Sequence, residues 1–116
     1  MTGLQARLRA DLLTARKARD TTATAALRST LAAIANAEAL PVADSSPAAE
    51  GPIAGAATGI GATEAVRRDL SEEDIRGIVS GERTERLTAA TDLASHGAED
   101  RAEQLRAEAE LLAAYL

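Results

Sequence analysis

The chain of 116 residues contains no cysteine, tryptophan or phenylalanine, and Tyr115 is its only aromatic residue. Without cysteine there is no disulfide framework, no thiolate nucleophile and no Cys-ligated metal site. A β-sandwich or β-barrel is also excluded, because such folds need aromatic and β-branched side chains on their pleated faces. Apolar residues still make up 46% of the sequence, and most of them are alanine or leucine. We therefore expect an all-α fold with a thin, alanine-rich core.

The sequence also lacks the features of a membrane or secreted protein. It has no run of about 20 apolar residues that would span a bilayer, and its first 19 residues are charged throughout, unlike a secretory signal. We expect one soluble, cytoplasmic domain with no membrane partner. The net charge is −5, which argues against general nucleic-acid binding. The charge is uneven, however, with a balance of +3 over residues 1–20 and −6 over residues 64–116.

Two amphipathic helices are predicted in the first 39 residues. Their apolar positions recur at helical spacing in two stripes, one of Leu4, Leu8, Leu12 and Ala15 and the other of Ala23, Leu27, Leu31 and Ile34. Asp20 has the position of an N-cap for the second helix, which Thr21 and Thr22 open. Because only a few residues separate the two helices, they should form an antiparallel hairpin.

The second half predicts another pair of helices. A short helical turn over 63–70 is followed by Ser71 and three acidic residues, a favourable start for a long helix over Glu72–Ser95. Gly97 supplies the left-handed residue that ends this helix. A last helix is expected from about Glu99 to Tyr115.

The segment between the two hairpins has a different composition. It contains all three prolines and four of the eight glycines, which predicts a flexible linker. A phosphate-binding loop fits poorly, because no Lys-Ser or Lys-Thr follows the glycines and no strand precedes them. The prediction is thus a single helical-bundle domain over residues 1–116, with four main helices in antiparallel hairpins at 2–39 and 64–116, joined by a Pro/Gly/Ala-rich linker at 40–63.

Few residues are candidates for catalysis. His96 is the only histidine and lies beside Gly97 at a predicted helix end, where a surface C-cap is its commoner role. No serine lies in a Gly-x-Ser-x-Gly elbow, and the Glu-x-x-His pairs of two-metal helical sites are absent. We therefore predict no catalytic residue, no metal site and no cofactor.

Three ionisable residues are predicted to point toward the seam between helices. Glu82 and Arg86 are four residues apart near the face that carries Ile75 and Val79, and Glu38 falls near the apolar face of the second helix. One interpretation is an internal salt bridge that fixes the helix register. The other is a polar groove that receives a ligand or partner, with Glu38, Glu82 and Arg86 as its binding residues.

A basic edge is predicted on the first helix. Arg9 and Arg16 are seven residues apart on one flank of its apolar stripe. They are candidates for contacts with phosphates, and Lys17 and Arg19 are further candidates on the same face. Solvated cations, or salt bridges to the acidic second half, are the commoner use of such residues, and the chain has no aromatic residues for base stacking beyond Tyr115.

The order of these features resembles the YqeY family. The first half matches in the "KARD" helix break at Lys17–Asp20 and in the run "LRSTLAAIANAE" that begins at Leu27. The second half matches in the acidic cap after Leu70, the Gly-terminated turn and the closing "ELLAAYL" of Glu110–Leu116. The resemblance covers about 90 of the 116 residues, with the Pro/Gly/Ala-rich segment as an insertion.

This bacterial family is similar to the C-terminal helical region of the GatB component of the aspartyl/glutamyl-tRNA amidotransferase. The resemblance implies an all-α fold and a role in tRNA-dependent amidotransfer, with tRNA, an amidotransferase component or an aminoacyl-tRNA synthetase as partner. It also implies the label of a carbon–nitrogen ligase with glutamine as amido donor, although the catalytic sites of that enzyme lie outside this helical region. Family members usually continue into a tail domain related to the part that contacts tRNA, whereas this chain stops at Leu116.

We therefore expect a non-catalytic accessory or binding domain. One alternative is a general protein–protein interaction module with no tRNA role. The other is an amidotransferase component that acts only within a complex. A thin alanine-rich core also makes a homodimer a candidate assembly.

Overall fold

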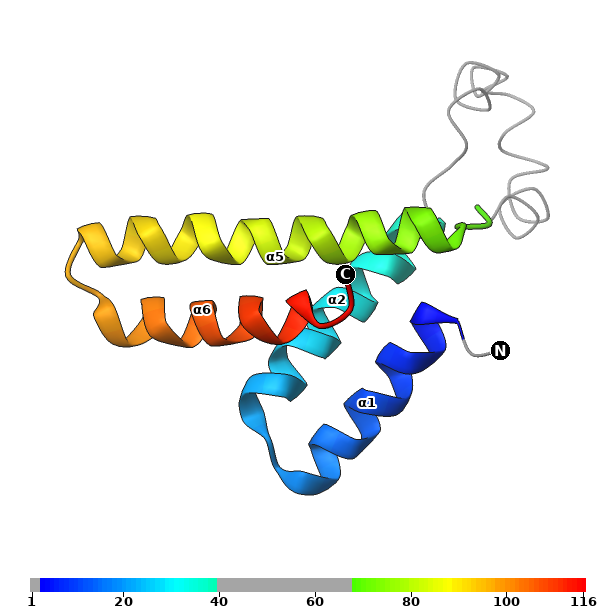
Figure 1. Cartoon of the computed structure of the whole chain (residues 1–116), viewed down its shortest axis with the longest axis horizontal. Helices are drawn as coiled ribbons and strands as arrows, with labels where there is room; N and C mark the ends of the chain where they lie inside the picture. Colours follow the sequence, from blue (N-terminus) through cyan, green and yellow to red (C-terminus); the bar gives the residue numbers. More distant parts are fainter. Residues whose placement is uncertain (1–2, 40–67) are drawn as a thin grey trace, which may run out of the picture. The chain divides into compact units, whose positions relative to one another are not determined.

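The computed structural model describes residues 3–39 and 68–116. They form four α-helices and no strand, so the all-α prediction is confirmed for this part of the chain (Figure 1). The predicted linker at 40–63, and most of the helical turn predicted at 63–70, lie outside the described residues. Residues 68–70 are not helical. The helices are α1 (Leu4–Ala18), α2 (Thr21–Ala39), α5 (Glu72–Ser95) and α6 (Glu99–Ala113).

The break between α1 and α2 is built by two complementary caps. Arg19 has a left-handed backbone with φ of 59°, and the N–H of Asp20 donates to the carbonyl of Ala15 at 2.9 Å, as in a Schellman motif. Asp20 then caps α2, because its Oδ1 accepts from the N–H of Ala23 at 3.0 Å. The predicted N-cap is confirmed.

The α5–α6 hairpin begins and turns as its sequence predicts. Ser71 and Asp74 form a reciprocal capping box, with both side-chain-to-backbone distances at 3.0 Å. Gly97 has a φ of +85° and follows the C-cap residue His96. α6 ends at Ala113, two residues before the predicted end, because Ala114 and Tyr115 close a tighter turn through i→i−3 hydrogen bonds.

The chain divides into two compact units, residues 1–34 with 71–116 and residues 35–70. In the second unit the described residues are the last turn of α2 and 68–70, where the N–H of Arg68 donates to the carbonyl of Glu38 at 3.0 Å. In the first unit α5 and α6 run antiparallel (Figure 1). Its fully buried apolar side chains come from all four helices, and the largest are Leu8, Leu27, Ile34, Val79 and Leu112.

Three long-range contacts connect α1 to residues 71–116 of this unit. Gly3, the N-cap residue of α1, has no side chain to cap the helix, so Glu72 from the first turn of α5 accepts the N–H of Leu4 at 3.0 Å instead. Beyond the end of α6, the hydroxyl of Tyr115 donates to Asp11. The guanidinium of Arg7 lies 5.1 Å from the centre of the same ring, at cation–π distance.

Among the described residues, none of the helices is both long enough and apolar enough to cross a bilayer.

Candidate functional site

A network of polar side chains joins α5 to α6 and reaches α2. Arg86 donates from Nε to Glu108 Oε1 at 2.8 Å and from Nη1 to Glu82 Oε1 at 3.0 Å. The side chains of Glu82, Arg86 and Glu108 are only 15%, 11% and 5% exposed. The structure therefore brings two of the three predicted seam residues together. Glu38 belongs to the second unit and is half-buried there.

Each of the two carboxylates accepts a further hydrogen bond. Ser29 donates to Glu82 at 2.9 Å, and Gln104 donates to Glu108 at 3.0 Å. Gln104 also lies 3.4 Å from the hydroxyl of Thr22. Because each carboxylate already accepts two hydrogen bonds from within the chain, we interpret the network as a structural connection between helices.

The Arg86 guanidinium stays charged inside this network. Burial lowers the pKa of Arg86, but the hydrogen bonds and the negative charges of Glu108 and Glu82 outweigh the burial and raise it. A permanently charged arginine with its donors directed at two carboxylates is not a proton donor or acceptor for catalysis.

Sequence reasoning missed Glu108, the most buried carboxylate of this network. A signal was present, because Glu108 falls within the apolar stripe of α6, three residues after Leu105 and four before Leu112. An acidic residue in such a stripe needs a buried cation, and Arg86 is that cation.

A second group of charged residues surrounds a surface pocket at the connection between α1 and α2. The pocket has a volume of about 370 Å³ and is lined by Arg16, Arg19, Thr21, Thr24, Ala25 and Arg28. We refer to it as the arginine pocket. It lies within the first unit, and its three arginines are exposed.

Local structure explains why these three arginines share one pocket. Arg16 lies in the last turn of α1, Arg19 is the left-handed residue that follows the helix, and Arg28 lies on α2 two turns after its start. The tight connection folds α2 back along α1, which places Arg28 beside the other two. Within residues 3–39 and 68–116, no carboxylate pairs with Arg16, Arg19 or Arg28.

Three guanidinium groups line one pocket without a carboxylate partner among the described residues, so they repel one another, and an anion in the pocket would relieve that repulsion. Arg16 was predicted as part of a basic edge, and it lines the arginine pocket. Arg9, the other predicted residue, is exposed on α1 but does not line it. Arg19 was also named with that edge and lines the pocket, whereas sequence reasoning missed Arg28, because its proximity to the other two depends on the left-handed turn.

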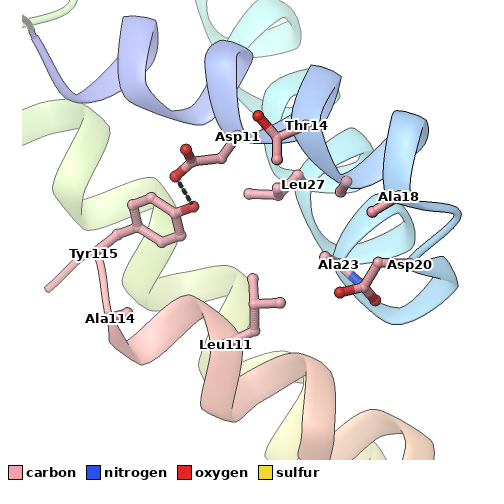
Figure 2. A pocket seen from close by; sticks show the side chains of 10 residues that line it. Asp11, Thr14, Ala18, Asp20, Ala23, Leu27, Leu111, Ala114 and Tyr115 are labelled. Carbon is pink, nitrogen blue, oxygen red and sulfur yellow. Dashed lines mark hydrogen bonds between the residues drawn. The ribbon is translucent and has the colours of Figure 1, made fainter.

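An apolar pocket of about 350 Å³ lies on another side of the same helical hairpin (Figure 2). Its lining includes Leu27 from α2, Leu111 from α6 and four alanines. Asp11 and Asp20 line it as well, but each already accepts a hydrogen bond, from Tyr115 and from the backbone of Ala23. The pocket is a shallow surface for apolar contact.

The remaining chemistry-bearing residues do not assemble into a site. His96 is exposed at the end of α5, where its ring nitrogen Nδ1 lies 2.8 Å from the carbonyl of Asp92, as expected for a C-cap side chain. Across the described residues, no group of three or more His, Asp or Glu side chains is placed to hold a metal ion.

Comparisons with protein-family models, with curated proteins and with solved structures found no match to this chain.

Proposed function

We propose that this chain is a non-catalytic, YqeY-like binding domain that contacts RNA phosphates through the α1–α2 hairpin. Its role would be accessory to tRNA-dependent amidotransfer in the cytoplasm. The order of sequence features that resembles the family supports this assignment. The four-helix architecture agrees with the all-α fold that the resemblance implies.

The observation that carries the proposal is the set of three arginines around one pocket, none of which pairs with a carboxylate in the described part of the chain. Residues 3–34 contain six basic and two acidic side chains, a net charge of +4, whereas residues 71–116 contain five arginines and eleven acidic side chains, a net charge of −6. A polyanion is therefore attracted to the α1–α2 hairpin and repelled by α5 and α6. This charge separation orients an RNA on the protein even though the whole chain is acidic.

Binding of this kind depends steeply on salt, because each phosphate contact releases condensed counterions. The logarithm of the affinity should fall linearly with the logarithm of the salt concentration, with a slope of about 0.7 for each phosphate contacted. For the arginine pocket we expect a slope between about 0.7, if its three arginines surround one phosphate, and about 2, if each contacts a separate phosphate.

The direct test is fluorescence anisotropy with labelled, unfractionated tRNA over a series of salt concentrations. The double variant Arg16→Glu/Arg28→Glu should lose binding. The matched control is Arg76→Glu/Arg101→Glu, which makes the same change in net charge at two exposed positions of α5 and α6. Equal loss in both variants would show that only the overall charge matters, and the proposal would then be wrong.

A protein-interaction role without tRNA is the second candidate, and the apolar pocket beside Tyr115 favours it. In that case a stoichiometric protein should co-purify after nuclease treatment. Ala114→Arg, which fills the pocket edge with a charged side chain, should release that protein. Ala107→Arg is the matched control, because it changes an exposed alanine of α6 that does not line the pocket.

A further inference from the structure

We propose that the arginine pocket takes a terminal phosphate monoester, the end of a nucleic-acid strand, in preference to the phosphodiesters within it. This inference rests on the proposed function and adds to it the chemical group that the pocket selects.

Positive charge is concentrated in the arginine pocket. A phosphate monoester carries a charge of about −1.5 to −2 at neutral pH and three terminal acceptor oxygens, whereas an internal diester carries a single negative charge. A surface that follows diesters needs cations spread along the strand. Here Arg16, Arg19 and Arg28 line a single pocket of about 370 Å³, an arrangement that suits one group of high charge with several oxygens.

Neutral hydrogen-bond donors also lie beside the three arginines. Thr21 and Thr24 line the same pocket, and their hydroxyl groups can donate to phosphate oxygens. Asp20, the acidic residue between Arg19 and Thr21, lines the apolar pocket instead and caps α2. No carboxylate therefore lines the arginine pocket.

Arg19 has a backbone conformation that is unusual for its residue type. Its φ of 59° lies in the left-handed region, and it is the only described residue other than glycine with a positive φ. Glycine adopts this conformation without the steric cost that a side chain brings, and it is the usual residue at this place after a helix. An arginine here opposes the local preference, which is typical of a position kept for its side chain.

The test uses one short single-stranded RNA made in two forms, with a 5′-phosphate and with a 5′-hydroxyl. We expect the intact chain to bind the phosphorylated form about tenfold more tightly, the effect of one additional charge-assisted hydrogen bond. Inorganic phosphate should compete with the 5′-phosphate and so abolish the difference in affinity between the two RNA forms. Arg19→Gly should remove this preference while raising the melting temperature, a combination that a purely structural residue would not give.

Arg76→Gln is the control, because it removes one exposed positive charge from α5 and should leave the preference unchanged. Equal binding of the two RNA forms by the intact chain would overturn the inference and leave the proposed function standing. Binding of neither form, together with inorganic phosphate bound at Arg19, would instead overturn the proposed function. Binding of neither RNA nor inorganic phosphate would overturn both.

Discussion

Arg86 on α5 and Glu108 on α6 form a buried ion pair, with 2.8 Å between Nε and Oε1. The two residues are 22 positions apart in the sequence and meet because the turn at Gly97 folds α6 back along α5. Their side chains are 11% and 5% exposed, so either charge would be destabilising if it were buried without the other. The pair links α5 to α6 beside the buried cluster of Ala90, Ala102 and Leu105.

Removing the cation alone should therefore unfold the protein more easily. Arg86→Met leaves the buried carboxylates without their partner and should lower the free energy of unfolding by about 3–5 kcal/mol. The double variant Arg86→Met/Glu108→Leu should recover most of this loss, since no unpaired buried charge remains at Glu108. Urea denaturation measures both effects. Arg106→Ala is the control, because its ion pair with Glu103 is exposed and worth at most about 1 kcal/mol.

Thr30 presents the opposite case, a buried polar group with no partner in the described part of the chain. Its side chain is fully buried, and its hydroxyl makes no hydrogen bond to the described residues. Thr30→Val keeps the shape and removes the unsatisfied hydroxyl, so it should raise the free energy of unfolding by about 1 kcal/mol. The same substitution at the exposed Thr84 should change it by less than about 0.5 kcal/mol. A loss of stability in Thr30→Val would contradict this assignment.

Tyr115 should resist ionisation. Burial, the hydrogen bond to Asp11 and the charge of Asp11 together raise the pKa of Tyr115 well above its ordinary value of 10.0. The neutral phenol thus stabilises the folded state below pH 10, and this contribution is lost as the pH rises further. Because Tyr115 is the only aromatic residue, tyrosinate absorbance during an alkaline titration reports on it alone. Asp11→Ala should move the absorbance transition to lower pH, and an unchanged transition would contradict the contact.

Glu72 and Glu73 are adjacent acidic residues in the first turn of α5, and only Glu72 bonds to the N-terminus of α1. Glu72→Ala should lower the free energy of unfolding by about 1 kcal/mol, the usual cost of losing a cap. Glu73→Ala removes the same charge from the same helix turn and should cost only a few tenths of a kcal/mol. Thermal unfolding of the two variants measures the difference. If both variants lost the same free energy of unfolding, the stabilisation by Glu72 would come from the helix dipole of α5 alone, and the contact with Leu4 would contribute nothing.

The helix boundaries follow from short-range chemistry, and for this reason the sequence predicts them well. Asp20, Ser71 and Gly97 each act on backbone groups within a few residues of themselves, so their roles do not depend on the tertiary fold. The end of α6 was misplaced by two residues. The reason is that Tyr115 is held by a residue 104 positions earlier, a contact that no local pattern records.

The binding residues depend on how the helices fold back on one another, and the sequence predicts them less well. Arg16 is visible as a cation on a helix flank, but its neighbour Arg28 comes from the next helix. Their proximity requires the left-handed turn at Arg19, a conformation that residue type alone does not predict for arginine. The Glu82–Arg86 pair was predicted from its spacing of four. Glu108, in contrast, lies in an apolar stripe of α6, where only the pairing of α5 with α6 explains a carboxylate.

The proposed RNA site is the arginine pocket and not the buried network of Arg86. The most direct measurement is a titration of the isotope-labelled chain with tRNA, followed by the backbone amide signals of the described residues in NMR spectra. The largest shifts should fall on residues 16–28, and added salt should reverse them. Shifts centred on Glu82, Arg86 and Glu108, with residues 16–28 unchanged, would contradict the proposed site.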